Sequence, residues 1–291
     1  KKKNKVIVIS SAMSGSTNEL IEKSKQISDN FISSEYDVLV SSGEQISCAL
    51  ISGRLNHLGY KSQSWMGWQI PIITDENFSS SRIVQIYKKR ILNYLKKGGI
   101  PIITGFQGIN MNKRITTLGR GGSDASAIMI AKFFRAKKCV IYTDVKGVYT
   151  TDPKILKTAK KIHVISYEEM LEMASLGAKV MQPISIQDAR LNRIDIDVKS
   201  SFIKEDGTLI TKRKNIKNRR IITGISFTKS DTKITLIGVK DKPGIAAAIF
   251  KPLSESLINV DMVVQNISSN GKYTDLTFTI KSDDLQKTKK I

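Results

Sequence analysis

Cysteine and histidine are scarce in this sequence, with only two of each among 291 residues. Cys48 and Cys139 both lie in apolar periodic segments, a setting that favours buried thiols over a disulfide. Free thiols make a reducing cytoplasm the expected compartment. His57 and His163 fit ordinary surface or helix-end positions, and no group of Cys and His has the spacing of a zinc site. We therefore predict no metal-ligating residues.

Long apolar runs are also missing, since no stretch reaches the length that crosses a bilayer. The short apolar run at residues 6–9 follows a basic start and enters a loop, which is typical of a strand rather than a signal peptide. We expect no membrane partner. The hydrophobic share of 40% allows a sizeable core, and the length of 291 residues favours two domains.

Acidic residues are few relative to basic ones, 26 against 47, which gives a formal net charge of +21 at pH 7. This charge favours anionic ligands and makes a nucleic-acid binder one alternative. The lysines are scattered, however, and the sequence has no aromatic-basic RNA motif or helix-turn-helix pattern, so we expect no nucleic-acid partner. DNA binding that vanished at moderate salt would mark a non-specific charge effect. The densest basic run, residues 212–220, fits a solvated connector.

Short β-rich runs alternate with helical stretches up to about residue 205. This alternation predicts an α/β domain over residues 1–205, with a mostly parallel sheet between two layers of helices. Ligands of such sheets bind beyond the carboxyl ends of the strands. Gly177 is expected to separate two helices. The predicted strands cover residues 5–10, 37–40, 100–104, 139–145 and 194–201, and a helix is expected to follow residue 44.

The order of predicted strands and helices changes after a basic linker that we place at residues 206–220. A helix should open after Pro243 and Gly244 and kink at Pro252, and another should begin with Ser282 as its N-cap. The order β-α-β-β-α predicts an α+β, ferredoxin-like domain over residues 221–291 that lacks its last strand. The strands predicted in this part of the chain cover residues 220–227, 233–239, 258–268 and 273–280.

The loop TTLGRGGSDASA, residues 116–127, holds three glycines, one arginine and one aspartate between apolar runs. Its glycines can let backbone N–H groups face an anion, the following helix adds a positive dipole end, and Arg120 offers a planar fork for a carboxylate or phosphate. The loop can equally be a glycine turn in which Ser123 caps the helix and Asp124 complements the dipole. The loop alone does not decide between these interpretations.

Three more polar loops are expected at strand ends. Asp144 and Asp152, in YTDVKGVYTTDP, could meet ribose or base groups or could form local Asx turns. Thr17, in SSAMSGSTNEL, could cap a helix, and Glu44, in SSGEQ, could simply complement a helix dipole. Because all four loops follow strands of one predicted sheet, we expect them to converge at one edge.

Together, TTLGRGGSDASA, YTDVKGVYTTDP and YEEMLEMASLGAKVMQP resemble motifs of the aspartate kinases, in the amino-acid kinase family. SSAMSGSTNEL, SGEQIS and GFQG agree with this, and GVKDKPGIAAAIFKPLSESLINVDMVVQN resembles the first ACT domain of those enzymes. The resemblance implies an amino-acid kinase fold followed by an ACT regulatory domain. It also implies ATP- and Mg²⁺-dependent phosphorylation of the side-chain carboxylate of L-aspartate to 4-phospho-L-aspartate, the first step toward lysine, threonine and methionine.

The resemblance also implies roles for individual residues. Glu44 would meet the amino group of the substrate, Arg120 would grip a substrate carboxylate, and Asp124 would organise the reaction centre. The residues implied to bind aspartate are Ser11, Thr17, Glu44, Arg120, Gly121, Gly122 and Ser123. Those implied to line the nucleotide site are Thr143, Asp144, Tyr149, Asp152, Lys154 and Lys179. Those implied to bind a feedback amino acid, lysine, threonine or both, are Asp241, Asn259, Val260 and Asp261. Because ACT domains of this kind pair between chains, a homo-oligomer is expected.

One departure from the family concerns the two ends of the chain. The family begins with a strand ending in a Lys-Phe-Gly-Gly-Thr-Ser motif that holds the phosphates, and this sequence starts after the place where that motif should stand. The second ACT domain is also incomplete or absent. We therefore expect these 291 residues alone to be inactive, which measurable formation of aspartyl phosphate would contradict.

Other interpretations stay open at this point. An amino-acid kinase acting on glutamate or N-acetylglutamate would share the fold, but the ACT-like segment and the SSAMSG loop argue against it. A non-catalytic amino-acid sensor with a degenerate kinase domain is disfavoured by Glu44, Arg120 and Asp124. For the ACT-like region, a dimerisation module without an effector response is the alternative to regulation.

Overall fold

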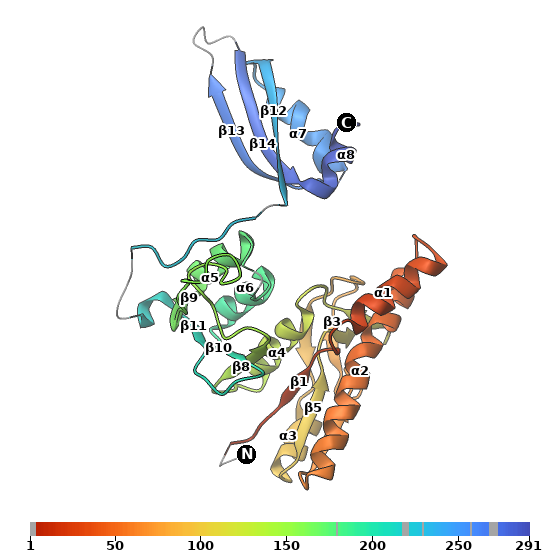
Figure 1. Ribbon diagram of the computed structural model, residues 1–291. Coiled ribbons are helices and arrows are strands. Elements are labelled where there is room, and N and C mark those ends of the chain that lie inside the picture. Colours follow the sequence, from red (N-terminus) through yellow and green to blue (C-terminus); the bar gives the residue numbers. More distant parts are fainter. Residues whose placement is uncertain (1–3, 179, 217–220, 229, 257, 268–272) are drawn as a thin grey trace. The chain divides into compact units, whose positions relative to one another are not determined.

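The chain forms two compact units, Lys1–Ser226 and Phe227–Ile291. The computed structural model describes residues 4–178, 180–216, 221–228, 230–256, 258–267 and 273–291. Figure 1 shows the elements of both units, which we describe separately. The expected domain limits, with a linker at residues 206–220, remain predictions.

The first sheet of unit 1 is parallel and has the strand order β1-β5-β2. It is formed by β1 (Val8–Ser10), β5 (Ile100–Thr104) and β2 (Ser62–Trp65), and Ser10 is the register partner of Thr104. The long helix α2 (Ser33–His57) packs along this sheet, and α1 (Ser16–Ile27) packs on α2 (Figure 1). The helix α3 (Lys89–Lys96) also contacts β5. The carboxyl ends of β1 and β5 therefore lie side by side.

Helix α2 corrects one prediction, because the strand expected at residues 37–40 is part of this helix. Its buried face is built from Asp37, Val40, Ser41, Gly43, Glu44, Ser47, Cys48 and Ser52. The spacing of these residues is helical, but most of them are small or polar rather than apolar. Hydrophobic periodicity therefore does not indicate the first half of this helix.

A second sheet has the order β4-β3-β6-β7 and leads into the glycine-rich loop. Its strands are β4 (Ile83–Ile86), β3 (Ile72–Thr74), β6 (Gln107–Ile109) and β7 (Ile115–Thr117). The hairpin β6–β7 is antiparallel, with Gln107 opposite Thr117. The helix α4 (Gly122–Phe133) follows directly and contributes Ile128 and Ile130 to the core. The predicted helix after the glycine loop is thus confirmed.

A third sheet, of order β8-β10-β11-β9, completes unit 1. Its strands are β8 (Cys139–Thr143), β10 (Ile196–Ser200), β11 (Thr208–Thr211) and β9 (Val164–Ser166). The helices α5 (Tyr167–Ser175) and α6 (Pro183–Asn192) are separated at Gly177, as expected. The α/β class is confirmed. Among the described residues, however, the strands of unit 1 form three hydrogen-bonded sheets and not one, and two of these sheets contain antiparallel pairs.

Unit 2 is an antiparallel sheet of order β12-β14-β13. It contains β12 (Asp231–Lys240), α7 (Ile245–Glu255), β13 (Val260–Ile267), β14 (Tyr273–Lys281), a 3-10 turn (Ser282–Asp284) and α8 (Leu285–Thr288). The core is formed by Leu253 of α7 together with Ile258, Phe278 and Ile280. The ferredoxin-like order β-α-β-β-α and the alternation along β14 are confirmed. Ser282 lies inside the 3-10 turn and is not an N-cap.

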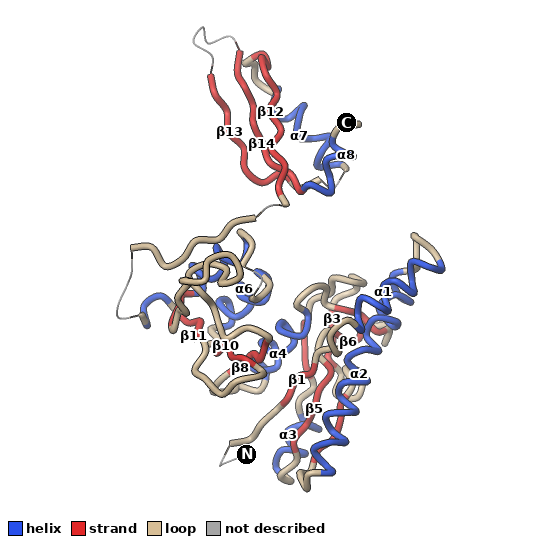
Figure 2. Tube along the Cα trace, in the orientation of Figure 1, coloured by secondary structure: helices blue, strands red, loops and turns tan. Residues whose placement is uncertain are grey.

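Residues 221–227 do not form the predicted strand, and Figure 2 draws this described segment as a loop. Thr223 and Ile225 form hydrogen bonds within unit 1 instead. The Ile225 N–H donates to the Thr150 carbonyl oxygen at 2.7 Å, and the Thr223 hydroxyl donates to Glu169 Oε1 at 2.6 Å. A Cβ atom on Gly224 would lie 3.0 Å from the Thr150 oxygen, so glycine allows this close approach. The β-rich composition of the segment had suggested a strand, but its hydrogen bonds go to a loop and to a helix side chain.

Candidate active site

The loop after β1, the loop after β5 and the start of α4 meet where β1 and β5 end. The Gly105 N–H donates to the Ser10 carbonyl oxygen at 3.0 Å, which joins the two strand ends. A Cβ atom on Gly105 would lie 2.7 Å from Ser123 Oγ, and the Phe106 N–H donates to Ser126 Oγ at 3.0 Å. The loops after β1 and β5 and the start of α4 therefore form one continuous surface.

The glycine-rich turn places the backbone at the start of α4. Gly119 and Gly121 both have φ 73, in the left-handed region that glycine tolerates. Gly121 is the N-cap of α4, and a Cβ there would lie 2.4 Å from Gln182 Cγ at the start of α6. Ser123 lies within α4 and makes no capping bond, which contradicts the alternative in which Ser123 caps the helix. The side chain of Arg120, between the two glycines, is exposed.

Glu44 lies in the middle of α2 rather than at a helix start, and only 3% of its surface is exposed. Its Oε1 accepts a hydrogen bond from the Ala12 N–H at 3.0 Å, which ties the loop after β1 to the helix. Its Oε2 is buried and has no hydrogen-bond partner among the described residues. Burial raises the pKa of this carboxyl to about 7. A buried acceptor without a donor is costly, so this oxygen is suited to a cationic or N–H ligand.

Asp124 lies in the first turn of α4 and is half-buried. Burial raises its pKa to about 6. Its carboxyl forms no hydrogen bond or ion pair with the residues that the structure describes. Cys139, at the start of β8, has its pKa raised to about 11 by burial and, secondly, by the charge of Asp124. Cys48 and Cys139 are both buried free thiols, as predicted.

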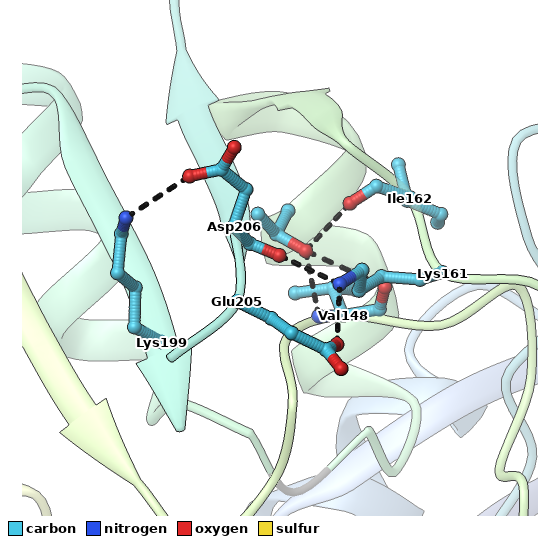
Figure 3. A network of polar contacts seen from close by, with 7 residues as sticks. Val148, Lys161, Ile162, Lys199, Glu205 and Asp206 are labelled. Atoms are coloured by element: carbon cyan, nitrogen blue, oxygen red, sulfur yellow. Dashed lines mark hydrogen bonds and ion pairs between the residues drawn. The ribbon is translucent and has the colours of Figure 1, made fainter. Parts of the chain in front are cut away.

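The loop between β8 and β9, which carries most of the expected nucleotide-site residues, is fixed to the β10–β11 hairpin (Figure 3). Thr208 is fully buried, and its Oγ1 accepts from the Val148 N–H at 2.8 Å and donates to the Ile162 carbonyl at 2.5 Å. A Cβ on Gly147 would lie 2.7 Å from this Oγ1. One hydroxyl therefore holds both arms of the loop.

An ionic network adds to this attachment. Lys161 Nζ donates to the carbonyl oxygen of Asp206 at 2.6 Å and pairs with Glu205 Oε2 at 3.5 Å (Figure 3). The Asp206 carboxylate in turn pairs with Lys199 Nζ at 3.4 Å. Because these groups come from β10, from the hairpin turn and from the loop, the network holds the three segments together.

Two of the expected nucleotide-site residues, Asp144 and Asp152, accept hydrogen bonds from near neighbours in the sequence. The Thr143 hydroxyl donates to Asp144 Oδ1 at 3.1 Å, and the Lys154 N–H donates to Asp152 Oδ1 at 2.8 Å, an Asx-type bond. Tyr149 forms an isolated β-bridge with Lys161. Lys179, the remaining predicted nucleotide residue, lies outside the described residues.

Of the other predicted substrate residues, Ser11 is exposed in the loop after β1. Thr17 lies inside α1, whose N-cap is Gly15, so Thr17 is not a cap. One residue that sequence reasoning missed is Asp37, which is fully buried on α2 and accepts hydrogen bonds from Ser79 and Thr117. Its position seven residues before Glu44, on the same face of one helix, was the available signal.

The predicted effector residues are split between the two ends of unit 2. Val260 and Thr232 share the register partner Ile280, whereas Asp241 follows Lys240, whose partner is Tyr273 at the other end of β14. From Thr232 to Asp241 is nine residues, about 30 Å at roughly 3.3 Å per residue. Asn259, Val260 and Asp261 therefore do not share a site with Asp241 in one copy. A pocket lined by β12 and α7, including Val239 and Ile245, opens near the Asp241 end.

Two features are missing from the described residues. None of their helices has the length and apolar character required to span a membrane. They also contain no group of three or more His, Cys, Asp or Glu side chains that could hold a metal ion.

Comparison with known proteins agrees with this architecture. Residues 1–200 match the Amino acid kinase family, and residues 234–291 match the ACT domain. The aspartokinase of Geobacillus stearothermophilus is 42% identical over 287 residues, which cover 99% of this chain and 70% of that protein. The aspartokinase of Helicobacter pylori strain 26695 is 45% identical over 290 residues, covering 98% of this chain and 71% of the relative.

Solved structures give the same result. E. coli aspartokinase III in complex with aspartate and ADP superposes with a TM-score of 0.73 at 27% identity, covering 91% of this chain and 60% of that one. Aspartate kinase from Synechocystis has a TM-score of 0.67 at 35% identity, with 99% of this chain and 48% of that chain covered. With both domain types matched in order and identity above 40% along nearly its whole length, the chain belongs to the aspartokinases of the amino acid kinase family.

Proposed function

We propose that this protein transfers the γ-phosphoryl group of ATP to the side-chain carboxylate of L-aspartate, forming 4-phospho-L-aspartate and ADP. The observation that carries the proposal is Glu44 Oε2, a buried carboxylate oxygen without a partner among the described residues, beside the loops where β1, β5 and α4 meet. An ammonium group is the natural partner of such an oxygen. The similar E. coli aspartokinase III was solved in complex with aspartate and ADP, which agrees with this chemistry.

The substrate residues follow from this placement. Glu44 would bind the ammonium group, and Arg120, which is exposed in the glycine turn, would bind a substrate carboxylate. The remaining aspartate-binding residues would be Ser11, Thr17, Gly121, Gly122 and Ser123. Because the side-chain carboxylate of aspartate is already ionised at neutral pH, with a pKa of about 3.9, the attack needs no strong base.

The nucleotide would lie over the loop that Thr208 and Lys161 hold in place, with Thr143, Asp144, Tyr149, Asp152, Lys154 and Lys179 as its contacts. Mg²⁺ in such sites is bound by one or two carboxylates together with substrate phosphates, so a cage of protein ligands is not required. The Asp124 carboxyl, which lacks a hydrogen-bond partner among the described residues, fits this role. When bound, the metal would neutralise phosphate charge during transfer.

The test is formation of aspartyl phosphate, trapped with hydroxylamine, by a full-length version of the protein supplied with ATP and Mg²⁺, because the 291 residues alone are expected to be inactive. We expect turnover with aspartate and at least about a hundredfold lower kcat/KM with glutamate, since the longer chain misplaces its carboxylate. Equal turnover of both would point to a broader amino-acid kinase. Nucleotide and aspartate binding without turnover would instead support a sensor.

We also propose regulation through unit 2 by lysine, threonine or both, with pairing of two copies. The separation of Asp241 from Asn259, Val260 and Asp261 supports pairing, because a two-fold axis across the sheet would place opposite ends of two copies together. Another structure of E. coli aspartokinase III is a complex with lysine and aspartate, which supports lysine as an effector. The two buried free thiols support a cytoplasmic location.

Isothermal titration of lysine and of threonine into the protein tests this regulation. We expect one of them to bind with saturation, and Asp241→Ala to abolish the heat of binding while leaving the molecular mass in light scattering unchanged. If neither amino acid binds, unit 2 is a dimerisation module without these effectors.

A further inference from the structure

Asp37 is a charged side chain at the centre of a saturated hydrogen-bond cluster. It is fully buried on α2. Its carboxylate accepts from the Ser79 N–H at 2.9 and 3.1 Å and from the Ser79 hydroxyl at 3.0 Å. It also accepts from the Thr117 N–H and the Thr117 hydroxyl, both at 2.8 Å. Ionised acceptors form the stronger class of hydrogen bond, so this contact fixes three segments that are distant in sequence.

The two residues that bond to Asp37, Ser79 and Thr117, lie next to the glycine turn. Thr117 ends β7, two residues before Gly119. Ser79 has φ 62, a left-handed conformation that is unfavourable for a side chain other than glycine, asparagine or aspartate and that its bonds to Asp37 help to maintain. A Cβ on Gly119 would lie 3.2 Å from the Ser79 carbonyl oxygen. Ser81 then joins this loop to β7 through its N–H and hydroxyl, both 2.9 Å from the Thr117 oxygen.

The same helix carries Glu44 seven residues further on. Two helical turns separate the carboxylates by about 10 Å along the axis, and both lie on the buried face. Through Glu44, α2 holds the Ala12 loop, and through Asp37 it holds the base of the turn with Arg120. One rigid element therefore sets the spacing between the two groups that would bind the substrate.

We propose that Asp37 is a positioning residue for the substrate site: it fixes the Arg120 turn relative to Glu44, and so matches the site to the short distance between the ammonium and carboxylate groups of a small amino acid. This inference rests on the proposed function for its substrate, but the mechanical part, the hold on the turn, is independent of it. A neutral amide could not replace the carboxylate, because its NH₂ group would face the N–H donors of Ser79 and Thr117.

The test compares Asp37→Asn and Thr117→Val with Thr116→Val in a full-length version of the protein. Thr116 is a matched control: it is equally buried on β7, but its hydroxyl pairs with Thr74 at 2.6 Å and not with Asp37. We expect Asp37→Asn to raise the KM for aspartate roughly tenfold and Thr117→Val a few-fold, with the KM for ATP within about twofold of native. Amide hydrogen exchange at residues 118–122 should accelerate in both variants and not in Thr116→Val.

Equal behaviour of Thr116→Val and Thr117→Val, or a parallel rise of both KM values, would reduce Asp37 to a stabilising residue and overturn the proposal. So would unchanged exchange at residues 118–122. If Asp37→Asn does not fold, the threonine pair decides the matter. If the native protein does not phosphorylate aspartate, the proposed function fails, and the exchange comparison alone then decides the positioning role.

Discussion

Replacing Glu44 by glutamine is expected to raise the KM for aspartate about a hundredfold. The amide keeps the size of the side chain but removes the negative charge that would face the substrate ammonium group. Hydrogen bonds to charged groups contribute about 1.5–3 kcal/mol, and a hundredfold change corresponds to about 2.7 kcal/mol. The measurement is steady-state kinetics, with the KM for ATP as the internal reference. An unchanged KM for aspartate would remove Glu44 from the substrate site.

The same substitution should change how stability depends on pH. The folded pKa of Glu44 is raised to about 7, from an ordinary value of 4.5, because the carboxyl is buried. The stabilisation that the protonated Glu44 carboxyl contributes to the folded state is therefore fully present below pH 4.5. It is lost as pH rises to about 7, because the folded state binds this proton more tightly than the unfolded state does. Over this window the loss is on the order of 3 kcal/mol. Glutamine has no such titration, so the variant should be more stable than the native protein at pH 8.

Urea unfolding at pH 5 and pH 8 measures this difference. Glu35→Gln is the matched control, since Glu35 lies on the same helix but is exposed, in a surface ion pair with Arg114. An exposed pair contributes only about 0–1 kcal/mol, so this variant should follow the native pH profile. Identical profiles for native protein and Glu44→Gln would contradict the assignment of a buried, largely protonated Glu44 at low pH.

Asp124→Asn is expected to lower kcat about a hundred- to a thousandfold, with little change in either KM. The half-buried carboxyl lies at the start of α4, next to the turn that would bind aspartate. Its charge would matter most during transfer, when it would orient the metal and the phosphoryl group, and loss of one such electrostatic group typically costs this much.

Asp188→Asn provides the control for this variant. Asp188, on α6, is also half-buried, and burial likewise raises its pKa, but it stands outside the predicted site. Its replacement should leave kcat within about twofold of native. Single-turnover kinetics would separate slow chemistry from slow product release. A kcat for Asp124→Asn close to the native value would assign Asp124 a purely structural role in the first turn of α4.

Local sequence patterns predicted those elements in which apolar residues occupy the buried positions and glycine occupies the breaks. The apolar run of α4 after a glycine turn, the break between α5 and α6 at Gly177, and the alternation along β14 were all visible in the sequence. The start of α2 was not, because its buried face consists largely of serine, aspartate and glutamate, and Asp37 and Glu44 are held there by tertiary hydrogen bonds that no local pattern shows.

The candidate site was predicted as a set of loops but not as a geometry. That the loops after β1 and β5 meet α4 follows from parallel pairing, which the sequence could suggest. The Glu44 oxygen without a described partner and the hydrogen bonds of Asp37 depend on how α2 packs, which no local pattern encodes. Likewise, capping by Ser123 or Thr17, which the sequence left open, does not occur because Gly121 and Gly15, in left-handed conformations, take those positions.

The attachment of residues 223–225 to unit 1 has a mechanical consequence. The segment that continues toward unit 2 is anchored at the Thr150 carbonyl and at Glu169. Thr150 is bonded in turn to Lys160, through its own N–H and through its side-chain oxygen. A pull on this segment would thus act on the loop that carries Tyr149 and Asp152, through Thr150, and on the start of α5, through Glu169. The segment that precedes unit 2 is therefore mechanically coupled to the loop predicted to bind the nucleotide.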